Sequence, residues 1–192
     1  MKDVARAAHV AWNLPEGVEP GLQESSVFDP TDWTYPFGTH AAVLEVDMET
    51  GEVRVIRYVA VDDCGNVVNP TIVEGQIHGG VAQGIGQALF EEVKYSAEGE
   101  LETGSFLTYT IPSATELPSF ELDRTVTPTS LNPLGAKGVG EAGTIGAPPA
   151  VMNALHDALE TDDEIDMPAS PERVWHAIRS LRSSDPRGSA AV

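Results

Sequence analysis

One carboxylate stands inside a glycine-rich stretch in the second half of the sequence. The stretch is GAKGVGEAGTIGAPPA, residues 135–150, and the acid is Glu141. Glycine-rich loops usually present bare backbone N–H groups to anions, and a carboxylate there repels a phosphate. Residue types alone allow two interpretations of Glu141. It is either an acid near the amino end of a helix, favoured by the helix dipole, or a general base on a loop that passes close to a reactive centre.

Gly138, Gly140 and Gly143 also spell the G-x-G-x-x-G pattern of dinucleotide-binding proteins, with Asp162 and Asp163 about twenty residues further on. The context argues against this interpretation. The pattern requires a strand directly before it, whereas the preceding TSLNPLGAK contains a proline and few β-forming residues. The phosphate-binding pattern G-x-x-x-x-G-K-[ST] is absent from the sequence.

The chain has 192 residues, of which 41% are hydrophobic, and this composition predicts a folded domain with a core. Its 30 acidic and 11 basic residues give a formal net charge of −19. A surface of this charge repels nucleic acids and anionic lipids, so neither is an expected partner. Cys64 is the only cysteine, and no internal disulfide or thiolate metal cage is expected. The sequence shows no long apolar stretch or signal-peptide pattern, so a cytoplasmic location is predicted.

The elements that would position Glu141 can be predicted from periodicity. A β-hairpin is expected from THAAVLEVD (39–47) and EVRVIRYVAVDD (52–63), with its turn at Gly51. The alternation in the second strand predicts four residues on one face: Val53, Val55, Val59 and Val61.

A glycine-rich helix is expected from Thr71 to about Tyr95, directly after Pro70. Its apolar residues recur every four positions: Val73, Ile77, Val81, Ile85 and Leu89. Five glycines lie in the same segment: Gly75, Gly79, Gly80, Gly84 and Gly86. At about 1 kcal/mol each relative to alanine, they cost roughly 5 kcal/mol of helix propensity. Close approach of another backbone or of a ligand is the usual compensation, and one of these is expected here.

The remaining segments complete an α+β (mixed α/β) fold. They are a helix over about 2–12, an irregular connector over 15–37, strand-like segments near 101–111 and 119–127, a helix starting at Pro148-Pro149, and a helix starting at Pro171 after Ser170 as cap. Residues 183–192 are predicted to be a flexible tail.

Three longer stretches together resemble one protein family. They are VAVDDCGNVVNPTIVEGQIHGGVAQGIGQALFEE (59–92), ETGSFLTYTIPSATELPSF (102–120) and NPLGAKGVGEAGTIGAPPAVMNAL (132–155). They resemble the molybdenum-binding large subunit of the xanthine dehydrogenase family, most closely the branch of aerobic carbon monoxide dehydrogenase large subunits. The resemblance runs from about Ala5 to Ile178. It implies that residues 1–182 form the carboxyl-terminal part of a molybdopterin-binding oxidoreductase domain.

The resemblance also implies roles for particular residues. In this family the glutamate of the G-x-G-E-x-G loop is an essential base beside molybdenum, and the matching residue is Glu141. The family hydroxylates with an oxygen atom derived from water, and a base assists proton removal. Gly138 and Gly140 would admit the loop to the cofactor. Four more residues match segments that approach the pterin dinucleotide: Asp63, Cys64, Asn69 and Gln76.

Some of these assignments have structural alternatives. Cys64 is as well explained as a small buried hydrophobic residue. His40 and His78 are expected to be core or surface histidines rather than metal ligands, because the pterin dithiolene usually holds the metal in this family. No metal ligand from this chain is therefore expected.

The family's chain is much longer than this sequence, and its upstream active-site loop has no counterpart here. In the carbon monoxide branch that loop carries a cysteine next to copper. The resemblance implies a molybdenum–molybdopterin cofactor, in its cytosine dinucleotide form, and a substrate that is carbon monoxide, an aldehyde or an N-heterocycle. Expected partners are the upstream part of the large subunit, an iron–sulfur subunit and a FAD subunit, with iron–sulfur clusters and FAD only on those partners.

Three functions are compatible with these observations. The chain is an enzyme component that is active when the upstream part is present, a non-catalytic truncated remnant that only binds sister subunits, or a free-standing nucleotide-binding module. The retention of every family motif in the covered region, Glu141 included, favours the first.

Overall fold

The computed structural model describes residues 1–184. The chain divides into two compact units, and the boundary between them in the sequence falls after Thr31. The first unit contains helix α1 (Lys2–Val10), which ends where Ala11 adopts a left-handed conformation. Residues 11–36 contain no helix or strand, as expected for the connector. The tail predicted from residue 183 falls mostly outside the described residues, and residues 183 and 184 belong to the last helix.

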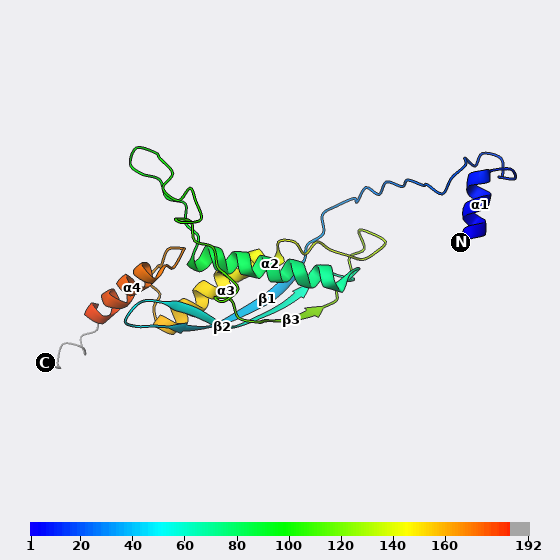
Figure 1. The fold of residues 1–192 in the computed structure, drawn as a ribbon. Coiled ribbons are helices and arrows are strands. Elements are labelled where there is room, and N and C mark those ends of the chain that lie inside the picture. The colour runs from blue at the N-terminus through cyan, green and yellow to red at the C-terminus, as the bar shows by residue number, and fades with distance from the viewer. Residues whose placement is uncertain (185–192) are drawn as a thin grey trace. The chain divides into compact units, whose positions relative to one another are not determined.

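The second unit is built on a three-stranded sheet with the strand order β1-β2-β3 (Figure 1). Strands β1 (Phe37–Val46) and β2 (Val53–Asp63) form the predicted antiparallel hairpin, and Gly51 has a positive φ in its turn. Strand β3 (Phe120–Thr125) pairs with β2 in parallel. Because parallel neighbours need a long crossover connection, a helix is accommodated between them.

A bulge in the hairpin decides which residues of β2 face inward. Ile56 is an extra residue, because its neighbours Val55 and Arg57 pair with consecutive residues of β1. Past the bulge, the buried inward residues are Tyr58, Ala60 and Asp62. The prediction that four valines share one face is therefore wrong. Val53 and Val55 lie on the inner side, whereas Val59 and Val61 lie on the opposite side because the bulge shifts the alternation by one residue.

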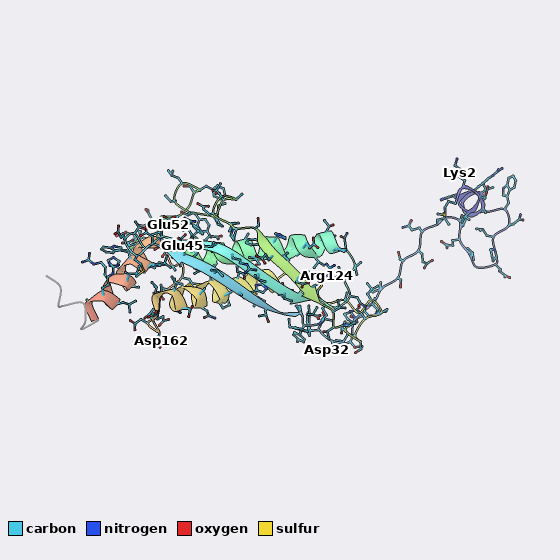
Figure 2. All side chains as sticks on the ribbon, turned by 90° about the horizontal axis from the view of Figure 1, so that it is seen from below. Lys2, Asp32, Glu45, Glu52, Arg124 and Asp162 are labelled. Carbon is cyan, nitrogen blue, oxygen red and sulfur yellow. The ribbon has the colours of Figure 1, made fainter. Side chains whose placement is uncertain are left out.

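Helices α2 (Pro70–Leu89) and α3 (Ala142–Leu159) cover one face of this sheet, and Figure 2, seen from below, shows the sheet in front of both. The predicted apolar face of α2 is confirmed. Val73 is partly buried and packs against the core. The other four residues of this face are buried in it: Ile77, Val81, Ile85 and Leu89. The helix ends at Leu89 rather than near Tyr95, and the Asn69 side chain caps its start by accepting the Ile72 N–H.

The two helices contact each other through glycines. A Cβ built on Gly80 would lie 2.9 Å from the Thr144 nitrogen, and one built on Gly143 would lie 2.7 Å from the Ile77 carbonyl oxygen. A side chain at Gly84 would likewise collide with α3. The Thr144 hydroxyl donates to the Gly80 carbonyl at 3.1 Å. Close backbone approach therefore compensates for part of the glycine cost in α2, as predicted.

Helix α3 begins earlier than its prolines suggest. The prediction of a start at Pro148-Pro149 is wrong, because the helix runs from Ala142 and both prolines lie inside it. Each proline leaves one helical carbonyl without its N–H partner and costs about 3 kcal/mol in a helix interior. Burial of the residues that follow stabilises the helix in spite of this cost: Val151, Met152, Leu155 and Leu159. Tertiary packing has thus overridden local propensity.

Helix α4 (Pro171–Ser184) begins after Ser170, as predicted, and the Ser170 carbonyl accepts the Val174 N–H at 3.0 Å. Val174 and Ile178 are buried in the core. The hairpin turn contacts the first turn of this helix, since a Cβ at Gly51 would overlap the Pro171 carbonyl oxygen. Glu45 and Glu52 mark this end of the hairpin in Figure 2.

The strand predicted near 101–111 is not present in the described part of the chain. Its one β-type contact is a bridge between Tyr95 and Leu101. Farther along, the Ser105 carbonyl accepts the N–H groups of Thr108 and Tyr109 and forms a local turn. A strand needs a neighbouring strand to satisfy its backbone groups, and none lies beside this segment within residues 1–184.

The observed combination of one three-stranded sheet and four helices agrees with the predicted α+β class. The strand predicted over 119–127 is confirmed as β3, and its Phe120 and Leu122 pack against the core. None of the helices within residues 1–184 is long and apolar enough to cross a bilayer.

Candidate functional site

The side chain of Gln76 lies beside Gly140, the residue directly before Glu141, and both Gln76 and Glu141 are predicted site residues. Gln76 lies on α2, about one turn before the contact between Gly80 and Gly143, and Glu141 directly precedes α3. A Cβ built on Gly140 would lie 3.6 Å from the Gln76 side-chain oxygen, which is an ordinary contact distance. The glycine contact between the helices therefore brings the Gln76 amide to the backbone segment that carries Glu141.

Both side chains at this junction are exposed and have no partner among residues 1–184. The Gln76 amide makes no hydrogen bond there, and the Glu141 carboxylate makes neither a hydrogen bond nor an ion pair. Glu141 occupies the N-cap position of α3 without a side-chain cap bond. A glutamine amide offers two N–H donors and one acceptor oxygen, and a carboxylate offers acceptors only. These groups are available to a ligand with matching polar edges.

Three glycines near this junction face open space. A Cβ built on Gly75, Gly79 or Gly138 would meet no atom within 4 Å. Packing inside the described part of the chain therefore does not require glycine at these positions. Their use in a helix and a loop beside Gln76 and Glu141 is consistent with approach by a group from outside the chain.

Asp63, another predicted site residue, is buried and bonded to the protein itself. Its carboxylate accepts from Lys137 Nζ and from the Gly65 N–H, each at 2.9 Å, and from the Thr125 hydroxyl at 2.9 Å. Burial alone would raise the pKa of Asp63, but hydrogen bonds from Lys137, Gly65, Thr127 and Thr125 hold it well below its ordinary value. Asp63 is therefore charged at neutral pH, and its visible role is structural.

Cys64 and Asn69 also have partners within the protein. The Cys64 carbonyl accepts the Lys137 N–H at 2.7 Å, and burial, followed by the charge of Asp63, raises the pKa of its thiol. Asn69 caps α2. The bonds of Asp63 and Cys64 with Lys137 connect the end of β2 to the segment that leads into Gly138. Direct contact of Asp63, Cys64 or Asn69 with a cofactor stays a prediction.

A cavity of about 750 Å³ lies between α3 and the segment that leads into β1. Glu141 lines it together with Ile145 and with aromatic side chains from the segment before β1 and its first residue: Trp33, Tyr35 and Phe37. His40 and Asp62 also line it, although both are buried. The cavity therefore combines apolar walls with an exposed carboxylate and a buried histidine–carboxylate pair.

The sequence alone did not predict this cavity. His40 is a core histidine and His78 an exposed one, as expected, but the role of Asp62 was missed. A signal for this cluster was available in β1. Alternate residues on one face of the strand are Gly38, His40 and Ala42, so two small residues flank the histidine. Its meaning depends on the pairing with β2, which the bulge at Ile56 sets.

The fold is that of a cofactor-binding domain of a known class. Residues 1–118, more than half of the chain, match the family model described as "Molybdopterin cofactor-binding domain". The chain belongs to this family. The matched range contains Asp63, Cys64, Asn69 and Gln76, and it ends before the loop that carries Glu141.

Individual relatives match the chain through that loop as well. The carbon monoxide dehydrogenase large chain of Hydrogenophaga pseudoflava is 40% identical over 178 residues, which is 90% of this chain and 22% of the relative. The nicotine 6-hydroxylase large subunit of Paenarthrobacter nicotinovorans is 44% identical over 186 residues, 94% of this chain and 22% of the relative. The solved structure of a Cu,Mo-CO dehydrogenase matches with a TM-score of 0.83 and 36% identity, over 96% of this chain and 23% of that one.

These matches confirm the resemblance to large subunits of the xanthine dehydrogenase and carbon monoxide dehydrogenase type. The chain spans between a fifth and a quarter of the length of these relatives. It corresponds to one part of a molybdenum hydroxylase large subunit.

Proposed function

We propose that this chain completes a molybdenum hydroxylase, with Glu141 as the base and Gln76 as a ligand of the molybdopterin cofactor. The observation that carries the proposal is that the Gln76 side chain lies beside Gly140, the residue before Glu141, and that both side chains are exposed and unpaired within residues 1–184. Family membership supports the class of cofactor. The printed names of two relatives, carbon monoxide dehydrogenase and nicotine 6-hydroxylase, support oxidation of a small molecule.

The residues at the junction fit a large polar cofactor. Gln76 can donate and accept at once, which suits the edge of a pterin. Gly75, Gly79 and Gly138 leave room on the α2 side and on the loop side. Within residues 1–184 no three His, Cys, Asp or Glu side chains are grouped so as to hold a metal ion. In the proposal the cofactor itself holds the metal, as the resemblance implies.

The cofactor, when bound, supplies a two-electron oxidation in which oxygen from water enters the substrate. Glu141 would accept the proton that this chemistry releases, and a positioned base typically contributes about 10²- to 10⁴-fold to the rate. The amino end of α3 carries a partial positive charge that favours an anionic carboxylate before reaction. Gln76 would orient the cofactor relative to that carboxylate.

The proposed activity requires other chains, since this one spans only part of its relatives' length. Relatives are named as a large chain, a large subunit and a complex subunit gamma, which supports a multi-subunit assembly. We propose the upstream part of the large subunit, an iron–sulfur subunit and a FAD subunit as partners, in the cytoplasm. The cytosine dinucleotide form of the cofactor and a substrate that is carbon monoxide, an aldehyde or an N-heterocycle belong to the same proposal.

Purification of the chain from its native host, without an added partner, tests this function. The complex is expected to contain molybdenum at one atom per chain and a second polypeptide that supplies the upstream part. Mass spectrometry identifies the chains, and elemental analysis measures the metal. A soluble monomer with stoichiometric molybdenum would contradict the need for a partner, and a complex without molybdenum would contradict the enzymatic role.

A non-catalytic remnant that only binds sister subunits is the second candidate. The exposed side chains of Phe106 and Leu107, in the segment after α2, favour contact with another chain irrespective of catalysis. In this case the sister subunits would co-purify, but molybdenum and turnover would both be missing.

A further inference from the structure

A buried cluster of three polar side chains lies between the sheet and α3. The His40 Nδ1 atom is 2.8 Å from the Tyr58 hydroxyl, and its Nε2 atom is 3.3 Å from each carboxylate oxygen of Asp62. The side chains of His40 and Asp62 are 4% and 3% exposed, and Tyr58 is fully buried. We call these three residues the His40 cluster.

The distances in the His40 cluster allow every polar side-chain group to be paired. Burial, and then the charge of Asp62, raises the pKa of the Tyr58 phenol above its ordinary value, so the phenol keeps its proton. An ionised carboxylate can only accept. With the imidazole proton on Nε2, Tyr58 donates to Nδ1 and the N–H at Nε2 donates to Asp62. Every polar atom of the imidazole has a partner, as a buried ring requires.

The pairing of β1 with β2 builds room for this cluster from small residues. Each of its members stands opposite glycine or alanine: Gly38 opposite Asp62, His40 opposite Ala60 and Ala42 opposite Tyr58. A Cβ at Gly38 would overlap the Asp62 carboxylate. Because diagonal neighbours across strands lie within reach of long side chains, His40 meets Tyr58 on one side and Asp62 on the other. The arrangement depends on the register past the bulge at Ile56.

Helix α3 rests directly on the His40 ring. A Cβ built on Gly146 would lie 2.5 Å from Nδ1 and 2.7 Å from Cε1 of His40, so the helix lies too close to the ring for any side chain at this position. Glu141 precedes Gly146 by five residues, and His40, Gly146 and Glu141 line the same cavity. The position of the His40 ring above the sheet therefore limits how closely the first turns of α3 can approach the sheet.

We propose that His40 is a positioning residue, which through Gly146 holds the first turns of α3, and with them Glu141, at a fixed depth against the sheet. Tyr58 and Asp62 fix the ring that performs this role. The inference rests on the proposed function of Glu141 as a base. A misplacement of about 1 Å in a catalytic group costs on the order of 10²-fold in rate, so a small displacement of α3 has a large effect.

The test uses the complex that contains this chain, with the variants Gly146→Ala, His40→Phe and His40→Gln. Gly146→Ala inserts a methyl group between helix and ring without removing any hydrogen bond. His40→Phe keeps a flat ring but leaves Asp62 and Tyr58 unpaired, whereas His40→Gln keeps one donor and one acceptor. Gly104→Ala is the matched control, because Gly104 has only ordinary contacts, in a segment away from α3.

Two readouts separate the position of α3 from catalysis. Hydrogen exchange of a peptide over residues 139–150 is expected to quicken in Gly146→Ala and His40→Phe, with His40→Gln closer to wild type and Gly104→Ala unchanged. In the first two variants kcat is expected to fall by about 10- to 100-fold with KM nearly unchanged and molybdenum content retained, since placement of the base rather than substrate binding is altered.

Unchanged exchange over 139–150 in both Gly146→Ala and His40→Phe would overturn the positioning role. Faster exchange with normal kcat would support the contact between His40 and α3 but overturn its role in positioning the catalytic group, whereas the base role of Glu141 is tested separately by Glu141→Gln. If His40→Phe does not fold, Gly146→Ala decides alone, because it leaves the His40 cluster intact.

Discussion

Gly143 of α3 lies against the carbonyl group of Ile77 on α2 at a distance that excludes a side chain, since a Cβ there would be 2.7 Å from the carbonyl oxygen. This contact joins the helix that carries Gln76 to the helix that Glu141 precedes. The geometry of the proposed site is therefore set by backbone packing rather than by side-chain bonds between the two residues.

Substitution of Gly143 by alanine is expected to destabilise the protein by about 1–3 kcal/mol, because overpacking forces the helices apart. The gain in helix propensity, about 1 kcal/mol, offsets only part of this loss. Gly75→Ala is the matched control, since Gly75 faces open space on α2 and should gain stability. Thermal unfolding of both variants measures the difference. Equal effects of the two substitutions would contradict the close contact.

Gly79→Val tests whether the open glycines of α2 are approach sites. Nothing lies within 4 Å of a Cβ at Gly79, so the chain itself should tolerate the larger residue. If the cofactor passes there, the assembled complex should lose molybdenum while its folding is retained. Gln87→Val, at an exposed position farther along α2, controls for the β-branched side chain. Full molybdenum content in Gly79→Val would exclude this approach.

Glu141→Gln separates chemistry from architecture. The amide keeps the shape of the side chain but cannot accept a proton, so turnover should fall by at least about 10²-fold with normal molybdenum content. An acid that only interacts with a helix terminus contributes about 0.3–1 kcal/mol, and its loss would hardly change the rate. Glu172→Gln, in the first turn of α4, is the structural control. A Glu141→Gln enzyme that keeps its metal and more than about a tenth of the wild-type rate would refute the assignment.

Lys137→Met should be one of the most destabilising single changes in this region. The Lys137 and Asp63 side chains are 7% and 0% exposed and form an ion pair at 2.9 Å. Removing one partner leaves a buried charge uncompensated, which costs roughly 3–5 kcal/mol. The free energy of unfolding measured in urea checks this value. A loss below about 1 kcal/mol, the range of exposed pairs, would show that the carboxylate is hydrated or paired in another way.

Asp63 should also give a defined pH dependence to stability. Its pKa is held below the ordinary value of 3.8, so its stabilising contribution is complete above that pH and is lost as the pH falls toward the lower, folded-state pKa. The difference in unfolding free energy between wild type and Asp63→Asn should therefore be constant near neutrality and shrink below about pH 4. A difference that grows on acidification would have the wrong sign for this carboxylate.

The sequence was sufficient to predict the elements whose local pattern agrees with their packing. The hairpin was predicted because two β-rich runs flank the turn at Gly51, and the apolar face of α2 because its period-four pattern coincides with burial. Long motifs of unusual composition also led to the prediction that Gln76 and Glu141 are site residues. The proximity of the Gln76 side chain to Gly140 could not be predicted, because it depends on glycine contacts between helices that are distant in sequence.

The failures share a physical cause, which is tertiary context that outweighs local signals. Pro148 normally marks the first turn of a helix, yet α3 extends to Ala142 because its earlier residues pack on α2 and on His40. The segment 101–111 has strand-forming residues but no strand beside it. The helix cap formed by Asn69 and the buried ion pair of Asp63 were likewise not predicted, and contact of these two residues with a cofactor stays a prediction.

The extra residue at Ile56 makes β2 two half-strands that run out of phase. Val55 before it and Tyr58 after it both point inward, so Ile56 and Arg57 together occupy the outward interval that one residue would normally fill. Deleting Ile56 would restore simple alternation without exchanging inside and outside, whereas deleting Val59 would turn Tyr58 or Asp62 toward solvent. The outward interval of Ile56 and Arg57 is thus a place where the length of β2 can change by one residue while the faces of the sheet keep their identity.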